Sequence, residues 1–187
     1  MKSILAISVL LISTFAMAQK SPTAAVYSMP AIEVGFKSNT ATLPYSTANN
    51  QVTAFQLGVS GVYNLFESFG IRSGLFYSER PFSADYSGST TKGKLTYFDV
   101  PVQLMFKFEE YAGVYAGPSL SIKMSDEVSP GSLTGIKSTV MPFTFGAQFK
   151  FLPNMGLNVF FETVSGELAT NVESSRAVGV NLLFTMD

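Results

Sequence analysis

The twelve residues YFDVPVQLMFKF, at positions 97–108, alternate strictly between bulky apolar side chains and a mixed, more polar set. Strict alternation indicates a β-strand, because successive side chains point to opposite faces of a sheet. The stretch exceeds the length of about 5–6 residues that is usual for globular strands, and it suits a tilted membrane-spanning strand of about 9–11 residues. The bulky side chains therefore face either the core of a soluble protein or the lipid of a membrane. They are Phe98, Val100, Val102, Leu104, Phe106 and Phe108.

The composition of the chain favours lipid. Charged residues make up 13% of the 187 residues, whereas soluble domains average about 25%. A soluble sheet needs a charged outer face, and this chain has too few charges to supply one. It has no cysteine, which excludes a disulfide framework and thiolate chemistry. With a net charge of −1 and no run of lysine or arginine, we expect no nucleic-acid partner.

The N-terminus predicts export from the cytoplasm. Residues 1–18 contain one lysine, an apolar run over 4–15 and the small-residue site Ala16-Met17-Ala18, as in a cleaved signal peptide. A retained membrane helix is the alternative, but the run is shorter than the about 20 residues that a helical span requires. We therefore expect residues 1–18 to be removed, 19–30 to form a short N-terminal segment, and 31–187 to form one barrel domain.

Eight segments in the rest of the chain alternate between apolar and polar side chains. Because no further apolar run approaches the length of a helical span, a membrane-crossing chain of this kind must close into a β-barrel. One face of each segment is bulky and almost free of charge, and the other collects glycine, serine, glutamine and most strand charges. This polarity is typical of lipid-facing barrels. It disfavours a further alternative, a soluble exported ligand-binding barrel. The predicted strands are 31–37, 53–65, 69–78, 97–108, 112–125, 139–151, 155–163 and 176–185.

The connections between these segments alternate in length. Outer-membrane barrels have brief periplasmic turns and longer outer loops, with aromatic girdles at both boundaries. We therefore predict an all-β, eight-stranded, antiparallel, up-and-down transmembrane barrel in a bacterial outer membrane. Pro101, Pro118 and Pro142 fall within predicted strands, so we expect a bulge or a missing hydrogen bond at each. The long connections are 38–52, 79–94, 126–138 and 164–175, and the short ones are 66–68, 109–111 and 152–154.

Two stretches carry a resemblance to a known family. AVGVNLLF, at 177–184, resembles the terminal strand signal of bacterial outer-membrane barrels, with Gly179, Leu182 and Phe184 in the glycine and hydrophobic positions. The stretch 97–108 with the following YAGVYAGPSLS resembles the mid-barrel hairpin of the outer-membrane β-barrel domain family, which includes PorT-like proteins and eight-stranded barrels of the OmpA and OmpX type. The resemblance implies outer-membrane lipid and the outer-membrane assembly machinery as partners, without implying one activity.

Charges on the inward face are the candidate functional residues. The interior of an eight-stranded barrel is just wide enough for side chains to fill, so inward charges must pair or be hydrated. Both signs occur in each half, so we expect a salt-bridged plug; a narrow channel for small solutes, selective for anions because five of the eight charges are basic, is the alternative. The predicted interior network is Glu33, Lys37, Arg72, Asp99, Lys107, Lys123, Lys150 and Glu162.

Catalysis has little support in this sequence. The chain has no histidine and no cysteine, which excludes nucleophile–histidine pairs and imidazole metal ligands. A carboxylate pair from Asp99 and Glu162 could do acid–base chemistry, but we interpret both as countercharges to Lys123 and Lys37. We therefore expect a non-enzymatic barrel without metal or cofactor. Its role would be structural, or it would bind an extracellular partner through its outer loops.

Overall fold

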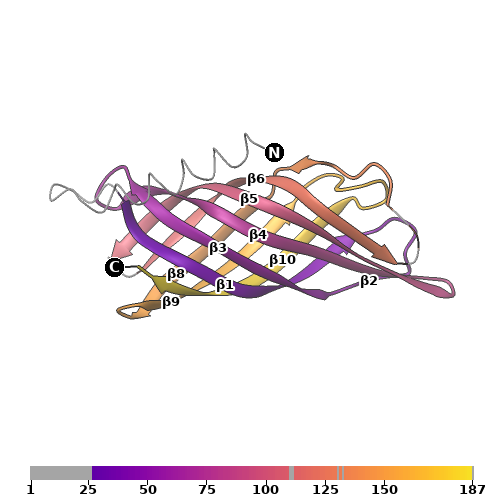
Figure 1. Ribbon diagram of the computed structural model, residues 1–187, viewed down its shortest axis with the longest axis horizontal. Helices are drawn as coiled ribbons and strands as arrows, with labels where there is room; N and C mark the ends of the chain where they lie inside the picture. The colour runs from indigo at the N-terminus through magenta and orange to yellow at the C-terminus, as the bar shows by residue number, and fades with distance from the viewer. Residues whose placement is uncertain (1–26, 110–111, 130, 132, 187) are drawn as a thin grey trace.

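The computed structural model describes residues 27–109, 112–129, 131 and 133–186, which form ten β-strands (Figure 1). Among these described residues, no helix is long and apolar enough to cross a membrane. The strands are β1 (Tyr27–Thr42), β2 (Ala48–Asn50), β3 (Val52–Asn64), β4 (Phe69–Tyr86), β5 (Ser89–Glu109), β6 (Ala112–Ser129), β7 (Thr139–Val140), β8 (Phe143–Leu152), β9 (Met155–Val164) and β10 (Ser174–Thr185).

Eight of these strands close into an antiparallel barrel. Each pairs with the next around the wall in the order β1, β3, β4, β5, β6, β8, β9, β10, and β10 pairs with β1 to complete the circle. The two short strands extend the wall, β2 along β4 and β7 along β6. The predicted all-β, eight-stranded barrel is therefore confirmed. The end that carries the long connections is called the outer end, and β10 ends at the opposite, inner end (Figure 1).

The alternation of β5 places its bulky apolar side chains outside the barrel. Val102 and Leu104 are 55% and 56% exposed, whereas their neighbours Gln103 and Met105 are buried. Phe98, Phe106 and Phe108 are exposed on the same face. The wall is therefore apolar outside and mixed inside, which is the arrangement of a barrel that crosses a membrane.

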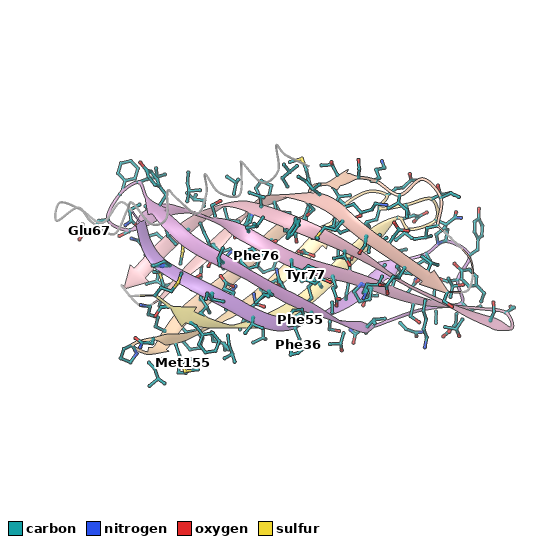
Figure 2. The ribbon with its side chains drawn as sticks, viewed as in Figure 1. Phe36, Phe55, Glu67, Phe76, Tyr77 and Met155 are labelled. Atoms are coloured by element: carbon teal, nitrogen blue, oxygen red, sulfur yellow. The ribbon has the colours of Figure 1, made fainter. Side chains whose placement is uncertain are left out.

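Aromatic rings form rows on the outer wall near both ends of this apolar band. Figure 2 shows Phe36, Phe55 and Tyr77 on neighbouring strands β1, β3 and β4. The ring centroids of Phe36 and Phe55 lie 5.8 Å apart, and those of Phe55 and Tyr77 lie 6.5 Å apart. Near the inner end, the Phe106 ring lies 4.9 Å from that of Phe69. Rows at two levels fit the pair of aromatic girdles expected at membrane boundaries.

The three prolines interrupt the ladders as expected. The β4–β5 ladder lapses between Ser73 and Phe76, opposite Pro101. The β5–β6 ladder lapses beside Pro118, which lacks the N–H that pairing requires. Pro142 separates β7 from β8. The predicted segment 139–151 is therefore two strands rather than one, because its proline falls at a break.

Several strands run past their predicted ends at the outer side. The segment 79–94, predicted to be a loop, belongs instead to β4 and β5, which are joined by a two-residue turn with Gly88 at φ 94°. Arg80, Phe82 and Ala84 are buried and continue the inward series of β4, and Pro81 and Ser83 between them are buried as well. At the inner end, β1 begins at Tyr27, within the segment predicted to precede the barrel domain. The β4–β5 hairpin projects farther than the other connections (Figure 1).

An apolar cluster fills the barrel at its outer end. It draws side chains from β1, β4, β5, β7 and β9 and from the β1–β2 and β9–β10 connections, so it spans the interior. Backbone hydrogen bonds from Lys137 N to Leu168 O and from Thr170 N to Thr134 O hold the two neighbouring connections against each other. We call this the outer cap; its buried members are Ala41, Leu43, Phe82, Ala84, Leu95, Tyr97, Val140, Val164, Leu168, Ala169 and Val172.

We expect Leu104→Arg to destabilise folding into a bilayer by roughly 2–4 kcal/mol, because it places a charge near the middle of the apolar outer face. Urea titration of the refolded barrel in phospholipid vesicles measures this cost. Ser87→Arg, at the exposed hairpin turn, is the matched control and should change stability little. Equal effects of the two substitutions would contradict a lipid-facing wall.

We expect Phe82→Ala to lower the free energy of unfolding by roughly 3–5 kcal/mol, because it removes a buried ring from the outer cap. The same titration serves as the measurement. Tyr45→Asn, at a 94% exposed site with positive φ, is the control, since asparagine tolerates that conformation. A loss no greater than that of the control would show that the cap is not a packed core.

Candidate functional site in the barrel interior

A buried carboxylate organises the inner half of the barrel. The Glu33 carboxylate is fully buried and accepts hydrogen bonds from the Arg72 guanidinium and the Ser60 hydroxyl. It also accepts from Asn158 Nδ2 at 2.8 Å and from Asn181 Nδ2 at 3.0 Å. The four donors come from different strands, and together they use the acceptor capacity of an ionised carboxylate. This group and its partners are called the inner charge layer.

The Arg72 guanidinium ties the same layer to the opposite wall. Its Nη1 donates to Gln103 Oε1 at 2.7 Å and its Nε donates to Gln148 Oε1 at 3.2 Å. Its central carbon lies 4.4 Å from the centre of the Tyr115 ring, a cation–π distance. The guanidinium is therefore buried with a partner on each side.

A second cluster lies nearer the outer end and is called the outer charge layer. Arg80 donates to both oxygens of Asp99, at 3.2 and 2.9 Å, and to both oxygens of Glu162, at 3.2 Å each. Lys37 Nζ donates to Glu162 Oε1 at 2.9 Å and to Ser78 Oγ at 2.8 Å. Bidentate guanidinium–carboxylate pairs are short, directional and strong. One arginine therefore joins β4, β5 and β9, and Lys37 adds β1.

The two layers are electrically balanced. The buried charges of the described residues are three cations and three anions, so their formal charges sum to zero. Each forms a salt bridge with an oppositely charged partner. The nitrogen–oxygen distances of the pairs that involve Lys37 and Arg80 are at most 3.2 Å, and Arg72 contacts Glu33 directly. Burying a charge is costly unless it is paired and hydrogen-bonded, and this arrangement meets both conditions. The six residues are Lys37, Arg72, Arg80, Glu33, Asp99 and Glu162.

The space between the layers is small. A cavity of about 20 Å³ lies there, with Arg72 on one side and Asp99 and Glu162 on the other. That volume accepts roughly one water molecule. Side chains thus fill the interior from the inner layer to the outer cap, as the width of an eight-stranded barrel allows.

The structure brings five of the eight predicted interior charges into these layers and leaves three outside. Lys107, Lys123 and Lys150 are only half-buried. Lys107 Nζ donates to Asn64 Oδ1 at 2.7 Å, near the inner end. Those within the layers are Glu33, Lys37, Arg72, Asp99 and Glu162.

The predicted partner of Lys123 is wrong. Its Nζ pairs with Asp126 at 2.7 Å, in a partly exposed contact three residues along β6. Arg80 neutralises Asp99 in its place. Arg80 was missed because Glu79-Arg80-Pro81 combines two charges with a proline and reads as a loop. The inward alternation Ser78, Arg80, Phe82 was the signal that could have found it.

The C-terminal residues singled out in the sequence lie on the strand that closes the barrel. Gly179 on β10 pairs with Lys37, and Leu182 and Phe184 face outward, each 40% exposed. A Cβ at Gly179 would lie 2.3 Å from the Phe160 ring, so glycine makes room for that ring inside the barrel.

We expect Arg80→Met to destabilise the refolded barrel by about 3–5 kcal/mol, because it leaves Asp99 and Glu162 as buried charges with too little compensation. The free energy of unfolding in detergent or vesicles measures this loss. Lys123→Met breaks an exposed pair and should cost no more than about 1 kcal/mol. Comparable losses would mean that the outer charge layer is hydrated rather than dry.

The chain resembles several solved structures, and the likeness to the first described here supports the same fold. Neisserial surface protein A is 15% identical, with a TM-score of 0.54, over 86% of this chain and 99% of that one. Ail, the attachment invasion locus protein of Yersinia pestis, solved with the heparin analogue sucrose octasulfate, is 17% identical with a TM-score of 0.47, over 83% of this chain and 97% of that one. OprG from Pseudomonas aeruginosa is 10% identical with a TM-score of 0.41, over 84% and 93%.

At these identities the likeness to Neisserial surface protein A concerns the fold alone. No curated protein matches the sequence. A family model described as "Outer membrane protein beta-barrel domain" matches residues 17–173, which is most of the chain. Together with the closed barrel and its apolar outer wall, this match shows that the chain belongs to the outer membrane protein beta-barrel domain family.

Proposed function

We propose that this protein is a non-enzymatic outer-membrane barrel with a plugged interior, and that it acts as a structural or surface-interaction protein through its outer end. The observation that carries the proposal is the complete pairing of the six buried charges in two layers across the interior. A conducting path lined by charges would need some of them to be free to bind and release ions. These charges instead bind one another.

The remaining interior also favours a closed barrel. The cavity between the charge layers has room for about one water molecule. Above it, the outer cap of apolar side chains spans the barrel. A continuous path would require both the Arg80 hydrogen bonds and the packing of Phe82 to be broken, and each step is costly.

The outer end offers a built surface for a partner. The β4–β5 hairpin and the end of β6 rise beside β2, and a groove of about 550 Å³ lies over them. Small-molecule sites usually have volumes of about 300–1,000 Å³. The groove presents amide, hydroxyl, lysine and carboxylate groups beside the apolar side chains of Val52 and Val128, so recognition would combine apolar contact with hydrogen bonds. Its lining includes Asn50, Gln51, Ser83, Lys92, Lys94 and Glu127.

Hydrogen bonds hold this projecting region in one arrangement. The Asp85 carboxylate, near the hairpin turn, accepts from Asn50 Nδ2 at 2.9 Å and from Thr90 Oγ1 at 2.7 Å. These two hydrogen bonds lower the pKa of the Asp85 carboxyl, and the bond from Asn50 has the larger effect. The carboxylate therefore stays ionised at neutral pH and keeps β2 attached to β4. A preorganised surface of this kind loses little entropy on binding.

The export of the chain and the location of the barrel in the outer membrane belong to the same proposal. Residues 1–18 would direct export and be cleaved, and 19–30 would lead into the barrel; residues 1–26 lie outside the described part of the chain. Outer-membrane lipid would cover the exposed face of Phe98, Val100, Val102, Leu104, Phe106 and Phe108. The assembly machinery would recognise the end of β10 through Gly179, Leu182 and Phe184.

Planar-bilayer recording of the refolded mature chain tests the plug. We expect confirmed insertion without conductance steps, because the interior charges are paired and the outer cap is closed. Insertion is checked on the same preparation by reconstitution into vesicles and flotation. Reproducible steps that shrink on Lys37→Met substitution would contradict the proposal and favour the narrow channel. Steps that Lys37→Met leaves unchanged would show a path elsewhere, and would contradict it equally.

A further inference from the structure

Two amide side chains flank a glycine on the inner wall of the barrel. Gly35 on β1 pairs with Gln56 on β3 and with Asn181 on β10. A Cβ at Gly35 would lie 2.4 Å from Asn181 Oδ1 and 2.0 Å from Val180 O, so only glycine fits there. Gln56 and Asn181 both line the cavity of about 20 Å³ between the charge layers.

Both amides leave an oxygen without a donor. Gln56 and Asn181 are 8% and 1% exposed, and neither Gln56 Oε1 nor Asn181 Oδ1 has a hydrogen-bond partner among the described residues. Asn181 cannot gain one by rotating its amide, because its Nδ2 donates to Glu33 Oε2 at 3.0 Å. A buried polar atom without a partner costs about 1–3 kcal/mol. Most such atoms in folded proteins are satisfied by the protein or by an ordered water.

We propose that the cavity is the binding site for one water molecule, which donates one hydrogen to Gln56 Oε1 and the other to Asn181 Oδ1. The volume matches one water, and the two orphan acceptors match its two hydrogens. The hydroxyl groups of Ser119 and Thr144 also line the cavity and can donate to the oxygen of the water.

The chemistry of the cavity favours water over an ion. A cation would meet the guanidinium of Arg72, which also lines the cavity. An anion would meet two unpartnered oxygen acceptors and the carboxylates of Asp99 and Glu162. The six buried charges of the two layers sum to zero, so an added ion would be a buried charge without a counter-ion, which is costly. A neutral molecule with two donors satisfies the site without adding a charge.

This water would also have a structural effect. It would bridge β3 to β10 across the glycine of β1, where no side chain can make that link. It would also lie between the inner and outer charge layers, so it would fill the gap between them. The barrel would then contain one localised hydration site between the layers rather than a column of water.

A crystal structure of the refolded mature protein at a resolution that shows ordered waters tests the site directly. We expect one water oxygen within roughly 3.2 Å of both amide oxygens. An empty cavity would overturn the proposal. Soaking in rubidium chloride separates water from a monovalent cation, because rubidium gives an anomalous signal; such a signal in the cavity would also overturn it.

A substitution tests the bridge in solution. Gln56→Met keeps the length of the side chain and removes its oxygen, so the nuclear Overhauser cross-peak between water and the Asn181 side-chain amide should be lost or strongly reduced. Gln51→Met, at an exposed position between β2 and β3, is the matched control and should leave that cross-peak unchanged. An equal cross-peak in wild type and Gln56→Met would show that Gln56 does not hold the water.

Discussion

The pairing of Arg80 with two carboxylates is the interaction on which the interior of this barrel depends. A membrane barrel cannot hydrate its inner wall with bulk water unless it is wide, and eight strands leave room only for side chains. Arg80 resolves this constraint by neutralising Asp99 and sharing Glu162 with Lys37. Its partners come from β5 and β9, so one buried cation fixes the relative positions of strands far apart in sequence.

Small residues complete the packing that the charges begin. Phe160 and Tyr115 point inward, and each ring lies over a glycine of a neighbouring strand: Gly179 in one case and Gly146 in the other. A Cβ at either glycine would lie within 2.6 Å of the ring atoms or hydroxyl. Large rings can therefore cross the interior without spreading the strands. Each large inward ring occupies the space that a glycine on the neighbouring strand leaves free. A wall with many small inward residues can therefore enclose little empty space.

The sequence predicted what depends on local periodicity, and it missed what depends on register. Alternation in 97–108 is visible within one strand, so the outward apolar face and the fold class followed from it. The inward position of Arg80 did not, because the proline beside it resembles a loop signal. Partners were harder still: Arg80 and Glu162 are 82 residues apart and meet only through the pairing of several strands. Lys123 lies beside the irregularity between Thr96 and Tyr97, where the simple alternation of β6 no longer decides its partner.

The β4–β5 hairpin changes its polarity along its length, and this change locates the boundary between two solvents. The outer face is apolar up to Tyr77 and Phe98, and the inner face carries charges as far as Arg80 and Asp99. Beyond them, Phe82 and Leu95 are buried inside, while Lys92 and Lys94 lie on the outer face. A strand in lipid must hide its polar groups, and a strand in water must hide its apolar ones. β5 has 21 residues, about twice the length that a membrane-spanning strand needs. The same backbone therefore serves first as a membrane wall and then as a water-exposed sheet, and the outer cap is the core of that second part.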